Sequence, residues 1–154
     1  MRMIQARILV SLVLLAPMVR IAEASSPHCS KKTAVGTWAF TVSGNIPAIG
    51  PAASVGTFTA DAWGNLSGSQ TRSLAGAVAD ETLSGTYTVN ADCTGTDVIQ
   101  VFESGVLVRT STLKVIYDEN GRGARAIFSL VVLPNGAALP TILTVDAKRI
   151  FISE

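Results

Sequence analysis

Histidine is nearly absent from this chain of 154 residues, and cysteine occurs only twice. The single histidine, His28, directly precedes Cys29. Nucleophilic catalysis by a serine or cysteine needs a histidine base beside the nucleophile, so we discount a catalytic triad. A zinc site needs three or four histidine or cysteine ligands, so we also expect no metal site.

Clusters of basic residues are missing as well. Adjacent basic residues occur only as Lys31-Lys32 and Lys148-Arg149, and 12 basic residues stand against 11 acidic ones. A nucleic-acid-binding domain carries a basic patch or stripe. We therefore expect neither nucleic acid nor anionic lipid as a partner.

Long hydrophobic runs are limited to the N-terminal segment, which has the pattern of a secretion signal. A basic start with Arg2 and Arg7 precedes an apolar run at residues 8–19, and Ala22-Glu23-Ala24 is an A-x-A cleavage site. The run of about a dozen residues is shorter than the roughly 20 that span a bilayer, so we expect no membrane span. We predict cleavage after Ala24 and a periplasmic or extracellular location. The chain then divides into a signal peptide at 1–24, an N-terminal tail at 25–34 and a β-barrel domain at 35–154.

The two cysteines, Cys29 and Cys93, remain in the exported chain, where the compartment is oxidising and disulfides persist. We predict that they pair with each other; two free thiols or half of a metal site is the alternative. Closing a loop of about 64 residues destabilises the unfolded chain by about 4 kcal/mol on the chain-entropy relation. The bond would also hold the N-terminal tail against the domain.

A Gly-Thr-aromatic triplet occurs three times, as Gly36-Thr37-Trp38, Gly56-Thr57-Phe58 and Gly85-Thr86-Tyr87. We interpret each triplet as the start of a strand, in which the threonine points to one face and the aromatic to the other, buried face. Alternating patterns and turn residues predict strands at 35–43, 55–60, 66–71, 83–90, 97–103, 106–117, 124–133 and 141–151, with a weaker one at 73–79. Residues 44–54, which include two prolines, form either a lid over a cavity mouth or a loop packed on the end of the domain. No helical period follows the signal segment.

About eight short strands in about 130 residues are typical of an antiparallel barrel or sandwich. We predict an all-β fold, a single antiparallel up-and-down β-barrel of about eight strands. A barrel of this size packs solid or holds one small ligand. The later strands have apolar residues on both faces, and contiguous apolar surface outside the barrel favours a homo-oligomer.

Six aromatic residues of the predicted strands are candidates to line a ligand pocket, because small-molecule sites are usually apolar pockets with a few polar groups. They are Trp38, Phe40, Phe58, Tyr87, Phe102 and Phe128. The alternative for each is ordinary core packing. Trp63 lies in a predicted turn, where it either gates the cavity mouth or anchors the turn.

Candidates for a catalytic role are Tyr87, Glu103 and Tyr117, although no motif identifies them. An inward Glu103 beside apolar neighbours would have a raised pKa, suited to acid–base work. An outward Glu103 is an ordinary surface carboxylate. The directions of Arg109 and Arg125 are equally open.

Two apparent motifs fail on their context. Residues 121–126 have the letters of the G-x-G-x-x-A dinucleotide fingerprint, but a strand follows where the fingerprint requires a helix. Asp80-Glu81 resembles a carboxylate pair, but neighbours in an extended chain point apart, so we interpret it as a solvated turn. We therefore expect no cofactor.

The Gly36-Thr37-Trp38 triplet resembles the G-x-W signature of the lipocalin and wider calycin barrels. The string at 85–96, with Gly56-Thr57-Phe58 leading into the turn at 61–65, is similar to a group of secreted bacterial proteins over most of the exported chain. That similarity implies no activity. The predicted architecture also resembles the allene-oxide-cyclase-like barrels, which include cofactor-free cyclases acting on apolar substrates, but no motif transfers their functional residues.

Three functions remain open at this stage. The first hypothesis is a secreted barrel that binds a small, largely apolar molecule without changing it. The second is a cofactor-free isomerase or cyclase that shapes its substrate, with a tyrosine or glutamate assisting. The third is an assembly protein with a solid core.

Overall fold

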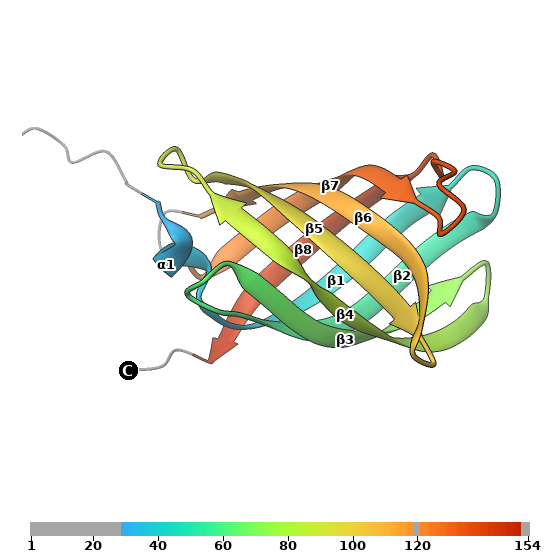
Figure 1. The fold of residues 1–154 in the computed structure, drawn as a ribbon, viewed down its shortest axis with the longest axis horizontal. Coiled ribbons are helices and arrows are strands. Elements are labelled where there is room, and N and C mark those ends of the chain that lie inside the picture. Colours follow the sequence, from blue (N-terminus) through green and yellow to red (C-terminus); the bar gives the residue numbers. More distant parts are fainter. Residues whose placement is uncertain (1–28, 119–120, 152–154) are drawn as a thin grey trace, which may run out of the picture.

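Eight antiparallel strands form a closed barrel in the computed structural model, which describes residues 29–118 and 121–151 (Figure 1). Consecutive strands are neighbours and β8 returns to pair with β1, so the predicted up-and-down barrel is confirmed. The predicted signal peptide, with its cleavage after Ala24, lies outside the described residues. The elements are α1 (Lys31–Ala34), β1 (Gly36–Ile46), β2 (Gly50–Ala60), β3 (Asn65–Leu74), β4 (Ala77–Val89), β5 (Thr94–Glu103), β6 (Val106–Tyr117), β7 (Gly123–Val132) and β8 (Ile142–Phe151).

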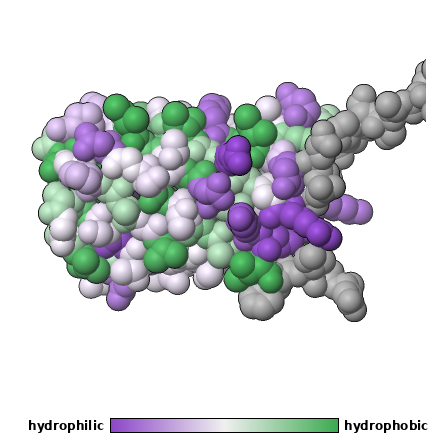
Figure 2. All heavy atoms as spheres, turned by 180° about the vertical axis from the view of Figure 1, so that it is seen from behind, coloured by the Kyte–Doolittle hydropathy of each residue, from purple (hydrophilic) through white to green (hydrophobic). Residues whose placement is uncertain are grey.

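Alternation along the strands separates an apolar interior from a more polar exterior. In β1, Trp38 and Phe40 are buried, whereas Thr41 between Phe40 and Val42 is exposed. This period of two is what a strand with one buried face requires. On the face shown in Figure 2, exposed apolar side chains lie among polar ones, and hydrophilic residues gather at one end. No helix among the described residues has the length and hydropathy to cross a bilayer.

The Gly-Thr-aromatic triplets do not all begin strands as we predicted. Gly36 begins β1, but Gly56 and Gly85 lie in the middle of β2 and β4. A Cβ on Gly56 would lie 2.3 Å from the Ser69 carbonyl oxygen, and one on Gly85 would lie 2.1 Å from the Val98 oxygen. These glycines therefore allow neighbouring backbones to approach closely, which is a role that glycine has inside strongly bent strands.

Two predicted irregular segments are parts of hairpins. Residues 44–54 are not a loop, because β1 continues to Ile46 and β2 begins at Gly50 after a short turn. Pro51 is tolerated because it stands next to the first residue of its strand. The weak strand at 73–79 is divided between β3 and β4 by Ala75 and Gly76, whose φ angles of 49° and 90° suit a tight hairpin turn.

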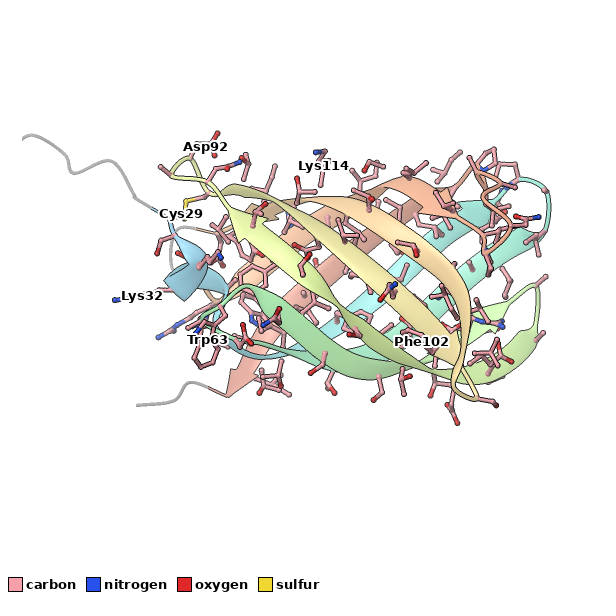
Figure 3. The ribbon with its side chains drawn as sticks, viewed as in Figure 1. Cys29, Lys32, Trp63, Asp92, Phe102 and Lys114 are labelled. Atoms are coloured by element: carbon pink, nitrogen blue, oxygen red, sulfur yellow. A yellow bond between two sulfur atoms is a disulfide. The ribbon has the colours of Figure 1, made fainter. Side chains whose placement is uncertain are left out.

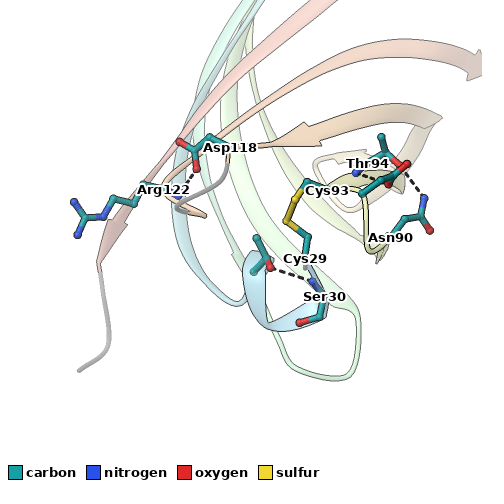
Figure 4. Close-up of a disulfide and its surroundings, with 9 residues drawn as sticks. Cys29, Ser30, Asn90, Cys93, Thr94, Asp118 and Arg122 are labelled. Carbon is teal, nitrogen blue, oxygen red and sulfur yellow. Dashed lines mark hydrogen bonds between the residues drawn. A yellow bond between two sulfur atoms is a disulfide. The ribbon is translucent and has the colours of Figure 1, made fainter. Parts of the chain in front are cut away.

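One end of the barrel is closed by the N-terminal segment. Cys29 and Cys93 form the predicted disulfide, with a Cα–Cα distance of 4.9 Å, directly before α1 (Figure 4). The indole of Trp38 is fully buried and donates a hydrogen bond to the Ala34 carbonyl oxygen at 2.8 Å. The guanidinium of Arg149 lies 5.0 Å from the Trp38 ring centre. The single turn of helix α1 therefore acts with Trp38 as a plug, where the sequence indicated an irregular tail.

The opposite end carries the hairpins β1–β2, β3–β4 and β5–β6 and the longer connection at 133–141 (Figure 1). Strands β7 and β8 pair only from Gly123 to Ile127 on the β7 side. The second half of β7 is instead bordered by the 133–141 connection, in which Leu139 donates its backbone N–H to the Val131 oxygen at 2.8 Å. This connection also lines the open mouth of the barrel.

Candidate functional site

A cavity of about 70 Å³ lies in the middle of the barrel, and a second space of about 240 Å³ forms its mouth. Four residues line both spaces, so the inner cavity adjoins the mouth. They are Val42, Gln70, Arg109 and Phe128. The inner walls are mainly aliphatic and aromatic, and the apolar members include Phe40, Phe58, Leu66, Leu83, Ile99, Val101, Leu113, Val115, Ala126, Val145 and Ala147.

The six aromatic candidates occupy three different places. Phe40, Phe58 and Phe128 line the inner cavity, and the Phe40 and Phe58 ring centres are 5.9 Å apart. Trp38 points inward but lies below the cavity, where its ring stacks on Phe58 with the centres 6.1 Å apart. Phe102 pairs with the exposed Thr82 of β4 and lies in an outer groove that residues of β1 to β4 also line. The structure thus brings three of the six together around the cavity.

Tyr87 belongs to the closed end of the barrel. Its hydroxyl donates a hydrogen bond to the Asp61 carbonyl oxygen, and its backbone N–H donates to the Gly64 oxygen at 2.8 Å. Burial, with the charges of Asp61 and Asp97, raises the pKa of Tyr87. Tyr87 therefore fixes the turn at 61–65 and does not line the cavity. Trp63 in that turn is 81% exposed, beside α1 and far from Phe102 (Figure 3), so it does not gate the mouth.

A buried ion-pair network forms one side of the mouth. The side chain of Glu81 has no exposed surface, and Arg109 binds both of its carboxylate oxygens at 2.7 and 2.6 Å. Arg72 donates to Glu81 at 2.6 Å and to Glu103 at 2.9 Å, and Gln70 donates to Glu81 at 2.6 Å. Burial opposes ionisation of Glu81, but the hydrogen bonds and charge of Arg109, with the hydrogen bonds from Gln70 and Arg72, hold the pKa of Glu81 below the usual value.

This network changes the interpretation of several charged residues. Glu81 is not in a solvated turn as we expected, because it shares the inner face of β4 with Leu83, while Asp80 points outward. Glu103 is an ion-pair partner at the rim with a side chain 39% exposed. Arg109 faces the interior, whereas the Arg125 side chain is 87% exposed and lies 3.8 Å from Asp146.

Asp97 and Ser111 are polar residues in the cavity wall that sequence reasoning missed. Asp97 is 9% exposed and Ser111 is 2% exposed, and Asp97 Oδ1 and Ser111 Oγ have no hydrogen-bond partner among the described residues. Burial raises the pKa of Asp97 to about 7. The alternation of β5 was the signal in the sequence. Asp97, Ile99 and Val101 are spaced two residues apart and therefore share one face of the strand.

Tyr117 also lines the cavity, at the end of β6. Burial raises its pKa, and the charge of Asp97 contributes. Its hydroxyl therefore stays protonated at neutral pH. Within residues 29–118 and 121–151, histidine, cysteine and carboxylate side chains do not gather in threes that could hold a metal ion.

Comparisons with known proteins identify the fold without a family. No family model matches the chain, and no curated protein matches it. A redesigned β-barrel, mFAP1, bound to DFHBI is similar at a TM-score of 0.53 and 16% identity, over 78% of this chain and 98% of that chain. EF1p2_mFAP2b bound to DFHBI is similar at a TM-score of 0.57 and 15% identity, over 81% and 99%. At such low identity these likenesses show the barrel fold alone.

Proposed function

We propose that this protein is a secreted β-barrel that binds a small, largely apolar molecule in its interior. The observation that carries the proposal is the apolar inner cavity, which adjoins an open mouth at one end while the disulfide, α1 and Trp38 close the other. Concave, mostly apolar sites with a few polar groups are the usual form of small-molecule sites. Two solved barrels of similar fold are bound to DFHBI, which supports a small molecule as the ligand of a barrel of this kind.

Export is part of the proposal. The A-x-A site ending at Ala24 supports a cleaved signal peptide. The Cys29–Cys93 disulfide supports an oxidising compartment, since such bonds persist mainly outside the cytosol.

The affinity would come mainly from removing apolar ligand surface from water. Each Å² of buried apolar surface contributes about 25 cal/mol before the costs of association. Phe40, Phe58 and Phe128 supply flat faces for a ring or a chain. The ligand enters through the mouth, past the connection at 133–141 that lines it.

Native mass spectrometry of the protein purified from its own source tests the proposal. We expect a bound small molecule, released unchanged on denaturation. The variant Ala126→Leu fills the cavity and should lose the ligand, whereas Ala39→Leu, placed in the outer groove, should keep it. Barrels that are always empty, or equal retention by both variants, would contradict the proposal.

A cofactor-free isomerase or cyclase is the second candidate, and Asp97 is the observation that favours it. A carboxyl group with a pKa of about 7 in the wall of a cavity suits general acid–base catalysis near neutral pH. The same experiment separates the candidates, because an enzyme would return a ligand changed in structure. An added ligand that is recovered unchanged after long incubation opposes catalysis.

The predicted homo-oligomer remains a prediction. Large apolar residues with at least 40% exposure cover several outer strand positions, and they include Val55, Val78, Val98, Val106, Ile116, Ile127, Leu130 and Ile142. Sedimentation velocity across a concentration series measures whether these positions associate. A single monomeric species at all concentrations would contradict it.

A further inference from the structure

The unmet hydrogen-bonding capacity of the cavity is concentrated on one wall. Asp97 lies opposite Leu113, and Ser111 lies opposite Ile99, so the two are diagonal neighbours on the inner faces of β5 and β6. Both are at least nine-tenths buried, and Asp97 Oδ1 and Ser111 Oγ have no partner in the described part of the chain. Buried polar atoms are almost always paired, because an unpaired one keeps the full cost of its desolvation.

Gln70 and Arg109, the polar side chains of the wall that also line the mouth, are already paired. Arg109 binds both oxygens of Glu81, and Gln70 donates to Glu81 while accepting a hydrogen bond from Ser54 at 2.9 Å. These groups therefore have less free hydrogen-bonding capacity for a ligand than Asp97 has. The polar side chains near the mouth therefore have their hydrogen-bond partners within the protein. Asp97 and Ser111, deeper in the barrel, do not.

The opposite wall is apolar. In a closed barrel of eight strands, β1 and β2 lie across from β5 and β6. Phe40 of β1 and Phe58 of β2 therefore stand across the cavity from Asp97 and Ser111. The inner cavity of about 70 Å³ is smaller than the roughly 150 Å³ that hold a benzene ring, so a ligand also occupies the adjoining mouth. The part of it in the inner cavity meets aromatic rings on one side and two unpaired oxygens on the other.

We propose that the ligand carries a hydrogen-bond donor, a hydroxyl or N–H group, on one edge of its apolar body, and that Asp97 and Ser111 bind this donor. This inference rests on the proposed binding function. Above its pKa of about 7, Asp97 is ionised and only accepts hydrogen bonds, and a serine hydroxyl both accepts and donates, so at pH 8 the pair matches a donor better than an acceptor. The ligand's donor supplies the hydrogen-bond partner that these two oxygens lack within the barrel.

The surroundings of Asp97 support this assignment. Tyr87 of β4 lies opposite it, and Tyr117 of β6 is near enough for its pKa to respond to the charge of Asp97. Both phenols are neutral at pH 7. Burial raises the pKa of Asp97 to about 7, and no basic side chain contributes to that pKa. A donor or a cation on the ligand would therefore stabilise the ionised carboxylate.

The test uses three probes of similar size, phenol, anisole and toluene, titrated into the exported chain at pH 8, where Asp97 is ionised, and followed by ligand-observed NMR. Phenol has a donor, anisole has the oxygen without the donor, and toluene has neither. We expect phenol to bind about ten-fold more tightly than anisole, since pairing a buried polar group is worth about that factor. Ser111→Ala should reduce this preference, and Asp97→Ala should remove it. Ser84→Ala on the exposed face of β4 is the matched control and should leave the preference unchanged.

The outcomes separate the inference from the function on which it rests. If all three probes bind and phenol has no advantage, the donor assignment is wrong and the binding function stands; water then satisfies Asp97. If none of the three binds, the binding function itself fails. If Asp97→Ala does not fold, Ser111→Ala decides the question, because removing one hydroxyl from a cavity wall leaves the packing intact.

Discussion

The unpaired carboxyl group of Asp97 predicts an unusual pH dependence of stability. Its pKa is about 7 in the folded barrel, against an ordinary value of 3.8, and burial is the cause. The folded state therefore holds this proton more tightly than the unfolded state does. By linkage, the free energy of unfolding falls as the pH rises from about 4 to about 7.

The magnitude follows from the two pKa values. One pKa unit corresponds to about 1.4 kcal/mol, so a rise from 3.8 to about 7 removes about 4 kcal/mol between pH 4 and pH 8, as an upper limit. The loss begins near the unfolded pKa and is complete above the folded one. Tyr87 and Tyr117, which face Asp97 from β4 and β6, have raised pKa values and stay neutral throughout this range. Glu81 has a lowered pKa, so its contribution is lost only at more acidic pH.

Urea unfolding at pH 4.5, 6, 7 and 8, followed by tryptophan fluorescence, measures this effect. We expect the wild type to lose stability across the series, and Asp97→Asn to be less dependent on pH and more stable than the wild type at pH 8. The control Asp146→Asn changes a carboxylate on the outer surface whose side chain is 57% exposed, and it should follow the wild type. If the wild type gains stability from pH 4.5 to pH 8, or follows Asp97→Asn throughout, Asp97 is hydrated and the reasoning is refuted.

Three further variants test the other supports of the barrel. Glu81→Gln should lower the free energy of unfolding by about 3 kcal/mol, because it leaves two partly buried guanidinium groups without their shared carboxylate. The control Asp80→Asn should stay within about 0.5 kcal/mol. Gly85→Ala should cost about 3 kcal/mol in urea unfolding, because the new Cβ would lie 2.1 Å from a carbonyl oxygen; an unchanged midpoint would show that β4 and β5 can separate there. Replacing Cys29 and Cys93 by serine should lower stability by about 4 kcal/mol, and a reductant should then affect only the wild type.

The period of two in the sequence predicted most strands, but it could not predict how deep each inward residue lies. Trp38, Tyr87 and Phe58 all point inward, yet only Phe58 reaches the cavity. Depth depends on the stagger between neighbouring strands, which turn lengths and bulges decide together. The register shift between Val101 and Phe102 is one such bulge, and no local pattern in the sequence predicts it.

The buried charges show a second limit of sequence reasoning. Glu81 has partners from two other strands, β3 and β6, and Arg109 follows it by 28 residues. Such a network is visible only when the closed sheet brings β3, β4 and β6 together. Alternation alone does place Glu81 on the face of Leu83, so the phase of β4 was a usable signal.

Glu81 and Asp97 are both buried carboxyl groups of neighbouring strands, but their surroundings imply different roles. Glu81 receives hydrogen bonds from Gln70, Arg72 and Arg109, so its charge is compensated within the protein and serves the fold. Asp97 has an unpaired oxygen, and because burial raises its pKa to about 7, we expect its ionisation to reduce stability at neutral pH. A residue that lowers stability, and whose cost no contact within the protein compensates, is best explained by a role in function. A variant such as Asp97→Asn that gains stability and loses preference for a donor-bearing probe would connect the two effects at one side chain. If stability rises and the preference for the donor-bearing probe is unchanged, the destabilising effect of Asp97 is not connected with ligand binding.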